Sequence, residues 1–482
     1  MLDDLIEERL KKLHKLETAK VNPYPAQSRR TLTAAEARKK FSALSCGRKK
    51  VYLAGRLMGL RDQGNIVFLD LTDESGRFQL VLKKENLKNF EFLKSVIDIG
   101  DFVSAGGALF KTKKGEESVE VREFDILTKS LRPLPSEWYG VEDVETRLRK
   151  RYLDLLVNPE TKEIFRKKAV FWEAFRDFLK REGFLEVETP VLESIPGGAE
   201  AEPFKTHMNA LDEDFYLRIS LELPLKRLLV AGFEKIFEIG RIFRNEGISK
   251  EHLQDFTQLE FYWAYHDYND LMVLLQKLYK GVIKKTCGGL TTVYEGKKIN
   301  WGKKWPRLDY VSEFKKGSGM DPLAASRDEL FRKAESLGLK PEKSAGKGRL
   351  IDLIFKKTVR LKLIQPCFLL DQPAEVEPLA KRSHKDLRVV ERVQIMAAGT
   401  ELGKGFSELN DPLDQRKRFE EQMKLREAGD KEAQRLDEEF LEALEYGMPP
   451  AAGFGVSERL FAVLMDKPVR ETVIFPLMRP KK

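Results

Sequence analysis

Cysteine is scarce in this sequence, with three among 482 residues. Cys46, Cys287 and Cys367 lie far apart and form no CxxC pair, so we expect a reducing compartment and neither a zinc site nor a disulfide framework. No apolar stretch approaches the roughly 20 uncharged residues that span a bilayer. The N-terminus mixes charges with its apolar positions, unlike a signal peptide. We therefore expect a cytoplasmic protein with no membrane partner.

Two nucleotide-binding fingerprints are also missing, because neither GxxxxGK(S/T) nor GxGxxG occurs. What is present is typical of a globular protein, with 42% hydrophobic and 10% aromatic residues. A chain of 482 residues is long enough for two or more domains. The formal net charge of +9 favours a polyanionic partner, although a merely solvated surface would have the same charge.

Changes in hydrophobic pattern divide the chain into segments. Residues 1–48 predict a helical segment, in which NPYP ends the first helix. From 49 to 130, five short alternating strands with glycine-bearing turns predict a small OB-type barrel, with a polar helical stretch before the fourth strand. A proline-bearing linker at 131–145 leads to a second domain at 146–482, and 277–365 has the character of a helical insertion. The fold class is therefore α+β with several domains.

The open face of an OB barrel commonly binds single-stranded nucleic acid. Arg61, Phe68 and Gln79 would offer a cation, a stacking ring and an amide to exposed bases there. Alternation alone favours Phe68 in the core of the barrel. Both interpretations stay open from the sequence.

Residues 243–265, FRNEGISKEHLQDFTQLEFYWAY, predict a hairpin with a long polar turn between two apolar strands. In the return strand, Phe256, Glu260 and Tyr262 share one face by the period-two rule, so that face can be the floor of a site while the other is core. A buried Glu260 without a cation would be costly, so either this face is wet, or Glu260 meets a cationic ligand or a structural arginine.

Phosphate-binding side chains gather at this turn and near the C-terminus. Arg244 can bind a phosphate through two hydrogen bonds, His252 suits a second anionic oxygen, and Phe256 can stack on a purine. The glycine-rich stretch at 447–461 precedes a helix that carries Arg459, which would neutralise another phosphate.

Two carboxylates seven residues apart, Glu401 and Glu408, would suit Mg²⁺, which takes hard oxygen ligands next to nucleotide phosphates. Two solvated acids would have the same spacing.

Three stretches, in this order, resemble the three motifs of class II lysyl-tRNA synthetases. They are GFLEVETPVLESIPGGAEAEPFKTH (183–207), the hairpin at 243–265, and GFGVSERLF followed by VRETVIFPLMRP. LELPLKRLLVAGFEKIFEIGR, PLAKR and ELGKGFSELNDPLDQR are similar to the same family, and the similarity covers nearly the whole chain. The resemblance implies an OB-fold anticodon-binding barrel followed by a catalytic domain with an antiparallel sheet flanked by helices.

The resemblance also implies roles for individual residues. Catalysis would depend on Arg244 and Arg459. ATP would be bound by Arg244, Glu246, His252, Phe256, Glu401 and Arg459, and Mg²⁺ by Glu401 and Glu408. Lysine would be bound by Gly198, Glu222, Glu260, Tyr262, Lys404, Phe406 and Glu408, and the tRNA anticodon by Arg61, Phe68 and Gln79.

The implied reaction is the ATP-dependent activation of L-lysine and its transfer to tRNA(Lys) by a homodimer. Three positions depart from the family pattern: Lys404 stands where an asparagine usually contacts the substrate carboxylate, Asp255 replaces a glutamate, and Glu458 replaces an aspartate in a third motif one residue shorter than usual. Two alternatives stay open, a ligase that attaches lysine to a protein and an inactive tRNA-binding paralogue. An aspartyl or asparaginyl specificity is disfavoured because Glu260 and Glu408 would repel an acidic substrate.

Overall fold

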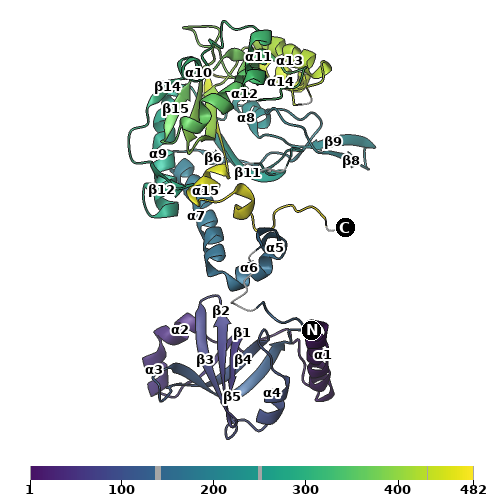
Figure 1. The fold of residues 1–482 in the computed structure, drawn as a ribbon, viewed down its shortest axis with the longest axis vertical. Coiled ribbons are helices and arrows are strands. Elements are labelled where there is room, and N and C mark those ends of the chain that lie inside the picture. The colour runs from purple at the N-terminus through teal and green to yellow at the C-terminus, as the bar shows by residue number, and fades with distance from the viewer. Residues whose placement is uncertain (1, 136–142, 248–251, 431, 481–482) are drawn as a thin grey trace. The chain divides into compact units, whose positions relative to one another are not determined.

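The computed structural model describes residues 2–135, 143–247, 252–430 and 432–480. The chain forms two compact units, which span Met1–Asp143 and Val144–Lys482 (Figure 1). Residues 136–142 of the expected linker and residues 248–251 of the expected hairpin turn lie outside the described residues. The expected domain bounds therefore stay predictions.

The first unit contains a closed five-stranded barrel with the strand order β1-β2-β3-β5-β4. Its strands are β1 (Lys50–Asp62), β2 (Ile66–Asp73), β3 (Gly76–Lys83), β4 (Phe102–Lys111) and β5 (Glu117–Thr128). Helices α1 (Leu2–Thr18), α2 (Ala34–Lys39) and α3 (Phe41–Cys46) precede the barrel, and α4 (Phe90–Val96) lies between β3 and β4. The predicted OB-type barrel is confirmed.

Alternation along the strands decides which side chains fill the barrel. Leu69 and Leu71 of β2 are fully buried. Phe68, the residue before Leu69, is only half-buried and lies outside the buried core. The interpretation of Phe68 as a core residue is therefore wrong.

The second unit is built on an eight-stranded sheet with the order β14-β15-β16-β17-β18-β11-β10-β6. Its strands are β6 (Leu185–Glu186), β10 (Lys235–Phe243), β11 (Asp255–Ala264), β14 (Arg307–Asp309), β15 (Cys367–Leu370), β16 (Arg392–Ala397), β17 (Thr400–Ser407) and β18 (Ala451–Ser457). All neighbours are antiparallel except the two edge pairs, β14 with β15 and β6 with β10.

Helices cover both faces of this sheet. Helices α7 (Pro159–Arg181), α9 (Tyr268–Cys287) and α15 (Arg459–Leu464) share one hydrophobic core with one face. Helices α8 (Glu222–Val230), α13 (Pro412–Glu427) and α14 (Glu438–Glu445) share a second core with the other. Strand β11 follows the predicted alternation, because Leu259 and Phe261 belong to the first core and Tyr262 to the second. The predicted antiparallel sheet flanked by helices is confirmed.

The expected insertion, 277–365, has mixed structure. It starts within α9 and contains the hairpin of β12 (Thr291–Tyr294) and β13 (Lys297–Asn300), and its strand β14 extends the main sheet. Its helices α10 (Tyr310–Ser318), α11 (Arg327–Ser336) and α12 (Lys347–Thr358) pack around a core that they share with β15 and β16. The second unit also contains α5 (Val144–Arg149), α6 (Arg151–Val157), β7 (Leu192–Glu193), β8 (Lys205–Met208), β9 (Glu213–Leu217) and the 3₁₀ helices η2 (Arg360–Lys362), η3 (Ala374–Val376) and η4 (Val469–Thr472).

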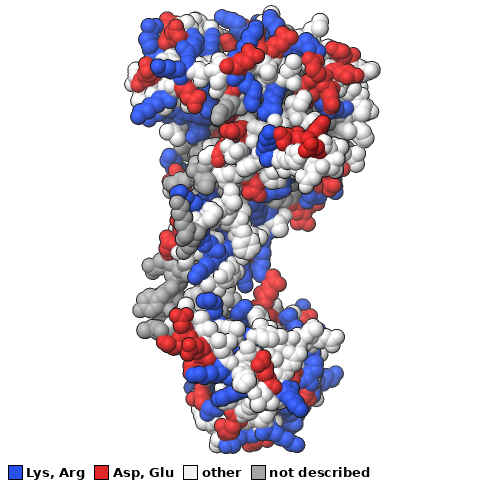
Figure 2. Space-filling model, turned by 90° about the vertical axis from the view of Figure 1, so that its right-hand side faces the viewer, with Lys and Arg blue, Asp and Glu red and all other residues white. Residues whose placement is uncertain are grey.

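Acidic and basic side chains are interspersed over the face that Figure 2 shows, so the net positive charge does not gather in one patch on that face. Among the described helices, none has the length and the apolar composition needed to cross a membrane.

Candidate active site

A cavity of about 830 Å³ opens on the sheet of the second unit. Its floor comes from β11, β17 and β18, and α12 and the start of α8 contribute to its wall. Every residue that the sequence assigns to ATP or lysine lines this cavity: Gly198, Glu222, Arg244, Glu246, His252, Phe256, Glu260, Tyr262, Glu401, Lys404, Phe406, Glu408 and Arg459. The fold therefore brings them together, while their individual roles stay predictions.

Glycines of β18 open the floor of the cavity. Gly455 pairs with Lys404 on one side and with Glu260 on the other, and Gly453 pairs in the same way with Phe406 and Tyr262. The side chains of paired residues point to the same face of the sheet. In each of these two rows, two functional side chains therefore stand on either side of a glycine, which has no side chain. A Cβ at Gly453 would lie 2.1 Å from Oε1 of Glu408. The glycine-rich stretch therefore makes room for the site.

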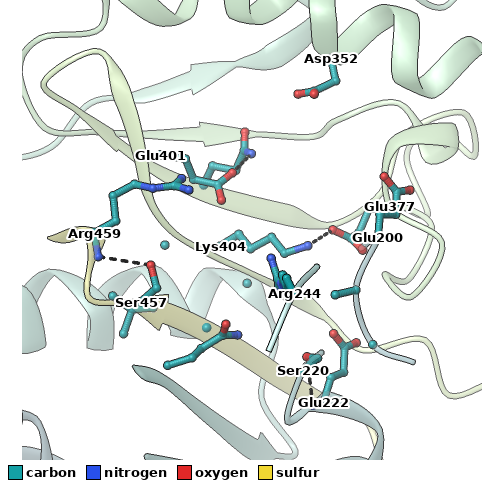
Figure 3. Close-up of a pocket in the computed structure, with 18 of the residues that line it drawn as sticks. Glu200, Ser220, Glu222, Arg244, Asp352, Glu377, Glu401, Lys404, Ser457 and Arg459 are labelled. Carbon is teal, nitrogen blue, oxygen red and sulfur yellow. Dashed lines mark hydrogen bonds and ion pairs between the residues drawn. The ribbon is translucent and has the colours of Figure 1, made fainter. Parts of the chain in front are cut away.

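Two arginines supply the positive charge of the anion-binding end of the cavity, and Figure 3 shows Arg459 near Glu401 and Arg244 near Lys404. Arg244 follows β10, and its Nε donates to the carbonyl of Ile219 at 3.1 Å while its guanidinium lies 5.3 Å from the centre of the Phe256 ring. Arg459 begins α15, where its backbone N–H donates to Oγ of Ser457 at 3.4 Å. This end is suited to an anion bound beside an aromatic ring.

Glu401 lies next to this anion-binding end. The Gln394 amide donates to its carboxylate, and Nη2 of Arg392 is 4.0 Å from the same oxygen. Burial alone would raise the pKa of Glu401, but Arg392 and Lys404 outweigh it and lower that pKa. An ionised carboxylate of this kind is a ligand that Mg²⁺ prefers.

Glu408 has different neighbours from Glu401. The charges that act on it are those of Lys226, Glu222 and Glu260, and its Oε2 lies 2.5 Å from Nζ of Lys226. Within the described ranges, no group of three or more histidine, cysteine, aspartate or glutamate side chains is arranged to hold a metal. Glu401 fits the predicted Mg²⁺, and a shared ion between Glu401 and Glu408 stays a prediction.

Three carboxylates form the other end of the cavity. Glu222, Glu260 and Glu408 are 5%, 3% and 1% exposed, and their charges act on one another. Burial raises the pKa of Glu222 to about 7 and that of Glu408 well above its ordinary value. This end is an acidic pocket with little access to water.

Glu260 accepts its hydrogen bonds from neutral groups. It accepts hydrogen bonds from Oγ of Ser220 at 2.8 Å, from the N–H of Leu221 at 3.1 Å, from the Gln258 amide at 2.6 Å and from the hydroxyl of Tyr262 at 2.9 Å. Among the described residues, these four donors are neutral, so the structural arginine considered from the sequence is not a hydrogen-bond partner of Glu260.

The built-in cation of the acidic pocket is Lys226, which sequence reasoning did not assign. Its side chain is fully buried, and Nζ donates to Oε1 of Glu222 at 2.7 Å besides its contact with Glu408. Neighbouring carboxylates outweigh burial and raise its pKa, so Lys226 is charged. The signal in the sequence is an i,i+4 Glu–Lys pair on a helix that is apolar apart from this pair and Arg227, and such a pair usually indicates a surface position.

Lys404 lies between the two ends of the cavity (Figure 3). Its Nζ donates to Oε2 of Glu377 at 2.8 Å, and that carboxylate is buried beside Arg392. Glu377 outweighs the effect of burial and raises the pKa of Lys404, so the ammonium is charged. Glu377 is a second residue of the site that sequence reasoning missed.

The predicted anticodon-binding residues lie together in the first unit. Arg61 pairs with Phe68 across β1 and β2, and Gln79 pairs with Asp70 across β2 and β3. Arg61 is exposed, whereas Gln79 is buried and accepts a hydrogen bond from Ser118 at 2.8 Å. The three residues share the outer face of the barrel, and their role stays a prediction.

Comparison with known proteins places this chain in a family. Residues 143–479 match the tRNA synthetases class II (D, K and N), and residues 51–127 match the OB-fold nucleic acid binding domain. The chain is 48% identical over 484 residues to the lysine–tRNA ligase of Moorella thermoacetica, a match that covers 100% of this chain and 99% of that protein. It is 44% identical over 490 residues to the lysine–tRNA ligase of Thermotoga maritima, a match that covers 100% of this chain and 97% of that protein. The chain therefore belongs to the class II tRNA synthetases, in the family of the lysine–tRNA ligases.

Proposed function

We propose that this chain activates L-lysine with ATP, releasing pyrophosphate, and transfers the lysyl group to the 3′ end of tRNA(Lys). The charge of the acidic pocket supports lysine as the substrate. Glu222, Glu260 and Glu408 carry three negative charges when ionised and Lys226 one positive charge, which leaves two negative charges. Lysine brings two ammonium groups, whereas an acidic side chain would be repelled.

Within this pocket, Glu222 binds the α-ammonium of the substrate, and Glu260, Tyr262 and Glu408 bind its ε-ammonium. Gly198 has φ of 83°, and a Cβ there would lie 3.0 Å from Cβ of Glu222, so glycine keeps the pocket open at the substrate backbone. The Phe406 ring forms an apolar wall 5.3 Å from Nζ of Lys226. Lys404 binds the substrate carboxylate.

ATP occupies the anion-binding end. Arg244 binds the α-phosphate, Arg459 the γ-phosphate, and Phe256 stacks on adenine. Glu246 and His252 assist nucleotide binding from the rim of the cavity. The lysine carboxylate then attacks the α-phosphorus in line, forming lysyl-adenylate and pyrophosphate.

This step depends on positioning and on Arg244, which stabilises the charge that develops on the phosphorus oxygens. Glu401, with Glu408 as the second predicted ligand, would hold Mg²⁺, which would neutralise charge on the nucleotide oxygens. The terminal ribose hydroxyl of tRNA attacks the carbonyl of lysyl-adenylate in the second step.

The barrel binds the anticodon through Arg61, Phe68 and Gln79. We also propose a homodimer in the cytoplasm. Leu185, Val191 and Leu192 in the first motif are between 38% and 51% exposed, and a subunit contact would cover them. Light scattering tests the dimer, and a fully active monomer would contradict it.

ATP–pyrophosphate exchange with each of the twenty amino acids tests the first step. Exchange with lysine alone is expected, and exchange with aspartate or asparagine would reject the assigned specificity. Product formation that depends on tRNA distinguishes the proposed reaction from attachment of lysine to a protein. An inactive tRNA-binding paralogue would show no exchange with any amino acid.

A further inference from the structure

The cavity contains a lysine of its own beside the pocket that the substrate lysine would occupy. Lys404 and Glu260 flank Gly455 on neighbouring strands, and both side chains point into the cavity. Neighbouring strands lie about 4.8 Å apart, so the two Cα positions are separated by about 10 Å with no side chain between them. The Lys404 side chain is long enough to cover most of that distance.

Charge alone would draw the Lys404 ammonium toward the acidic pocket. The three carboxyl groups of Glu222, Glu260 and Glu408 outnumber the one ammonium of Lys226, so the pocket attracts a further ammonium group, and the side chain of Lys404 has the same chemistry as the side chain of the substrate. A free Lys404 would therefore compete with the substrate. It is not free, because Glu377 accepts its hydrogen bond at 2.8 Å.

The position of Glu377 is fixed from the other side. Its carboxylate is 5% exposed and lies 3.5 Å from Nε of Arg392, which is also buried and begins β16. Lys404 is the more accessible partner, with 38% of its side chain accessible. The pair therefore joins a buried carboxylate to a more accessible ammonium, and Figure 3 shows Lys404 extended toward Glu377.

We propose that Glu377 is a positioning residue that holds Lys404 out of the acidic pocket, so that the ammonium groups of the substrate bind there. This inference rests on the proposed function. In the held position, Lys404 still offers its remaining N–H groups to the substrate carboxylate. Glu377 thereby allows a lysine at this position in an enzyme whose substrate is lysine.

Lysine-dependent ATP–pyrophosphate exchange of Glu377→Gln tests the proposal. We expect KM for lysine to rise about tenfold, as one mobile competing charge predicts, while kcat changes less than about threefold. In the double variant Glu377→Gln with Lys404→Asn, the competitor is absent, so KM should return to within about threefold of the value for Lys404→Asn alone. A structural role of Glu377 would leave the double variant as impaired as Glu377→Gln, and this outcome would overturn the proposal.

Two further variants keep the test decisive. Glu377→Asp keeps the carboxylate beside Arg392 but shortens its reach, so KM for lysine should rise by a smaller factor than in Glu377→Gln. This variant provides the test if Glu377→Gln does not fold. Asp386→Asn is the matched control. It removes a surface salt bridge of 2.7 Å with Arg388 in the same segment and should leave KM for lysine unchanged. An unchanged KM in Glu377→Asp and Glu377→Gln would reject the proposal.

Wild-type exchange distinguishes failure of this inference from failure of the proposed function. If the wild type exchanges with lysine and the double variant shows no rescue, only the inference fails. If the wild type does not exchange, the proposed function fails, and calorimetric binding of lysine to the same variants tests the positioning role directly.

Discussion

Binding of lysine should release protons, because the acidic pocket is partly protonated before the substrate arrives. Burial raises the pKa of Glu222 to about 7, so about half of the Glu222 side chains carry a proton at pH 7. Burial also raises the pKa of Glu408 well above its ordinary value, which adds to the bound protons. The two ammonium groups of lysine favour the ionised carboxylates and lower both pKa values. We expect Glu222 alone to release about half a proton for each lysine bound, and Glu408 to add to this release.

Isothermal titration calorimetry of lysine binding at pH 7 measures this release directly. The observed enthalpy is compared between phosphate and Tris, whose ionisation enthalpies differ, and the slope is the number of protons. Because the free-state pKa values are the higher ones, affinity for lysine should increase with pH through the window from about 6 to about 8. Glu222→Gln should release fewer protons than the wild type. A slope of zero, or proton uptake, would refute the assignment of these carboxylates to the ammonium groups.

Three further variants test separate parts of the site. Lys226→Met leaves buried carboxylates unpaired and should lower the free energy of unfolding by about 3–5 kcal/mol. Because these acids have pKa values above 4.5 in the folded protein, they are more fully ionised at pH 8 than at pH 5.5. The loss measured by urea unfolding should therefore be larger at pH 8. Arg244→Ala should reduce the rate of exchange about 10²- to 10³-fold with calorimetric lysine binding retained, and substantial remaining activity would remove its assigned role. Phe68→Ala should weaken tRNA charging by about 1–3 kcal/mol without changing exchange, whereas equal losses in both assays would contradict a role in the anticodon contact.

Local patterns in the sequence predict much of the fold. Alternation and glycine-bearing turns indicate the five strands of the barrel, and the period-two rule sorts Leu259 and Phe261 from Glu260 and Tyr262. These signals depend on neighbours along the chain. The order of the eight-stranded sheet depends on pairings such as β18 with β11, which join residues about 190 positions apart, and no local pattern contains them.

The candidate site divides in the same way. Its named motifs supply many of the residues that line the cavity, but the partners that set their charge come from elsewhere in the chain. Lys226 meets Glu408 and Lys404 meets Glu377 only after the sheet and its helices have assembled. Spacing also misleads, because Glu401 and Glu408 are near in sequence while different groups of charges act on them.

Glu458, one of the departures from the family pattern, has a structural role at the end of β18. It is 1% exposed, its Oε1 accepts from the N–H of Thr257 in β11 at 3.4 Å, and its Oε2 accepts from Nζ of Lys168 in α7. This carboxylate therefore joins β18, β11 and α7, which carry the family motifs or lie next to them. Arg459 is the next residue, so its direction depends on the same contacts.

Glu458→Asp should therefore reduce both stability and nucleotide binding. The shorter side chain cannot reach Thr257 and Lys168 together, and leaving one of these polar groups unpaired costs about 1–3 kcal/mol in the free energy of unfolding. Because Arg459 would lose its fixed direction toward the γ-phosphate, KM for ATP should rise while KM for lysine stays constant. Urea unfolding and ATP-dependent exchange measure the two effects. A variant with wild-type stability and wild-type KM for ATP would show that the longer side chain is incidental, and that the shorter third motif positions Arg459 without it.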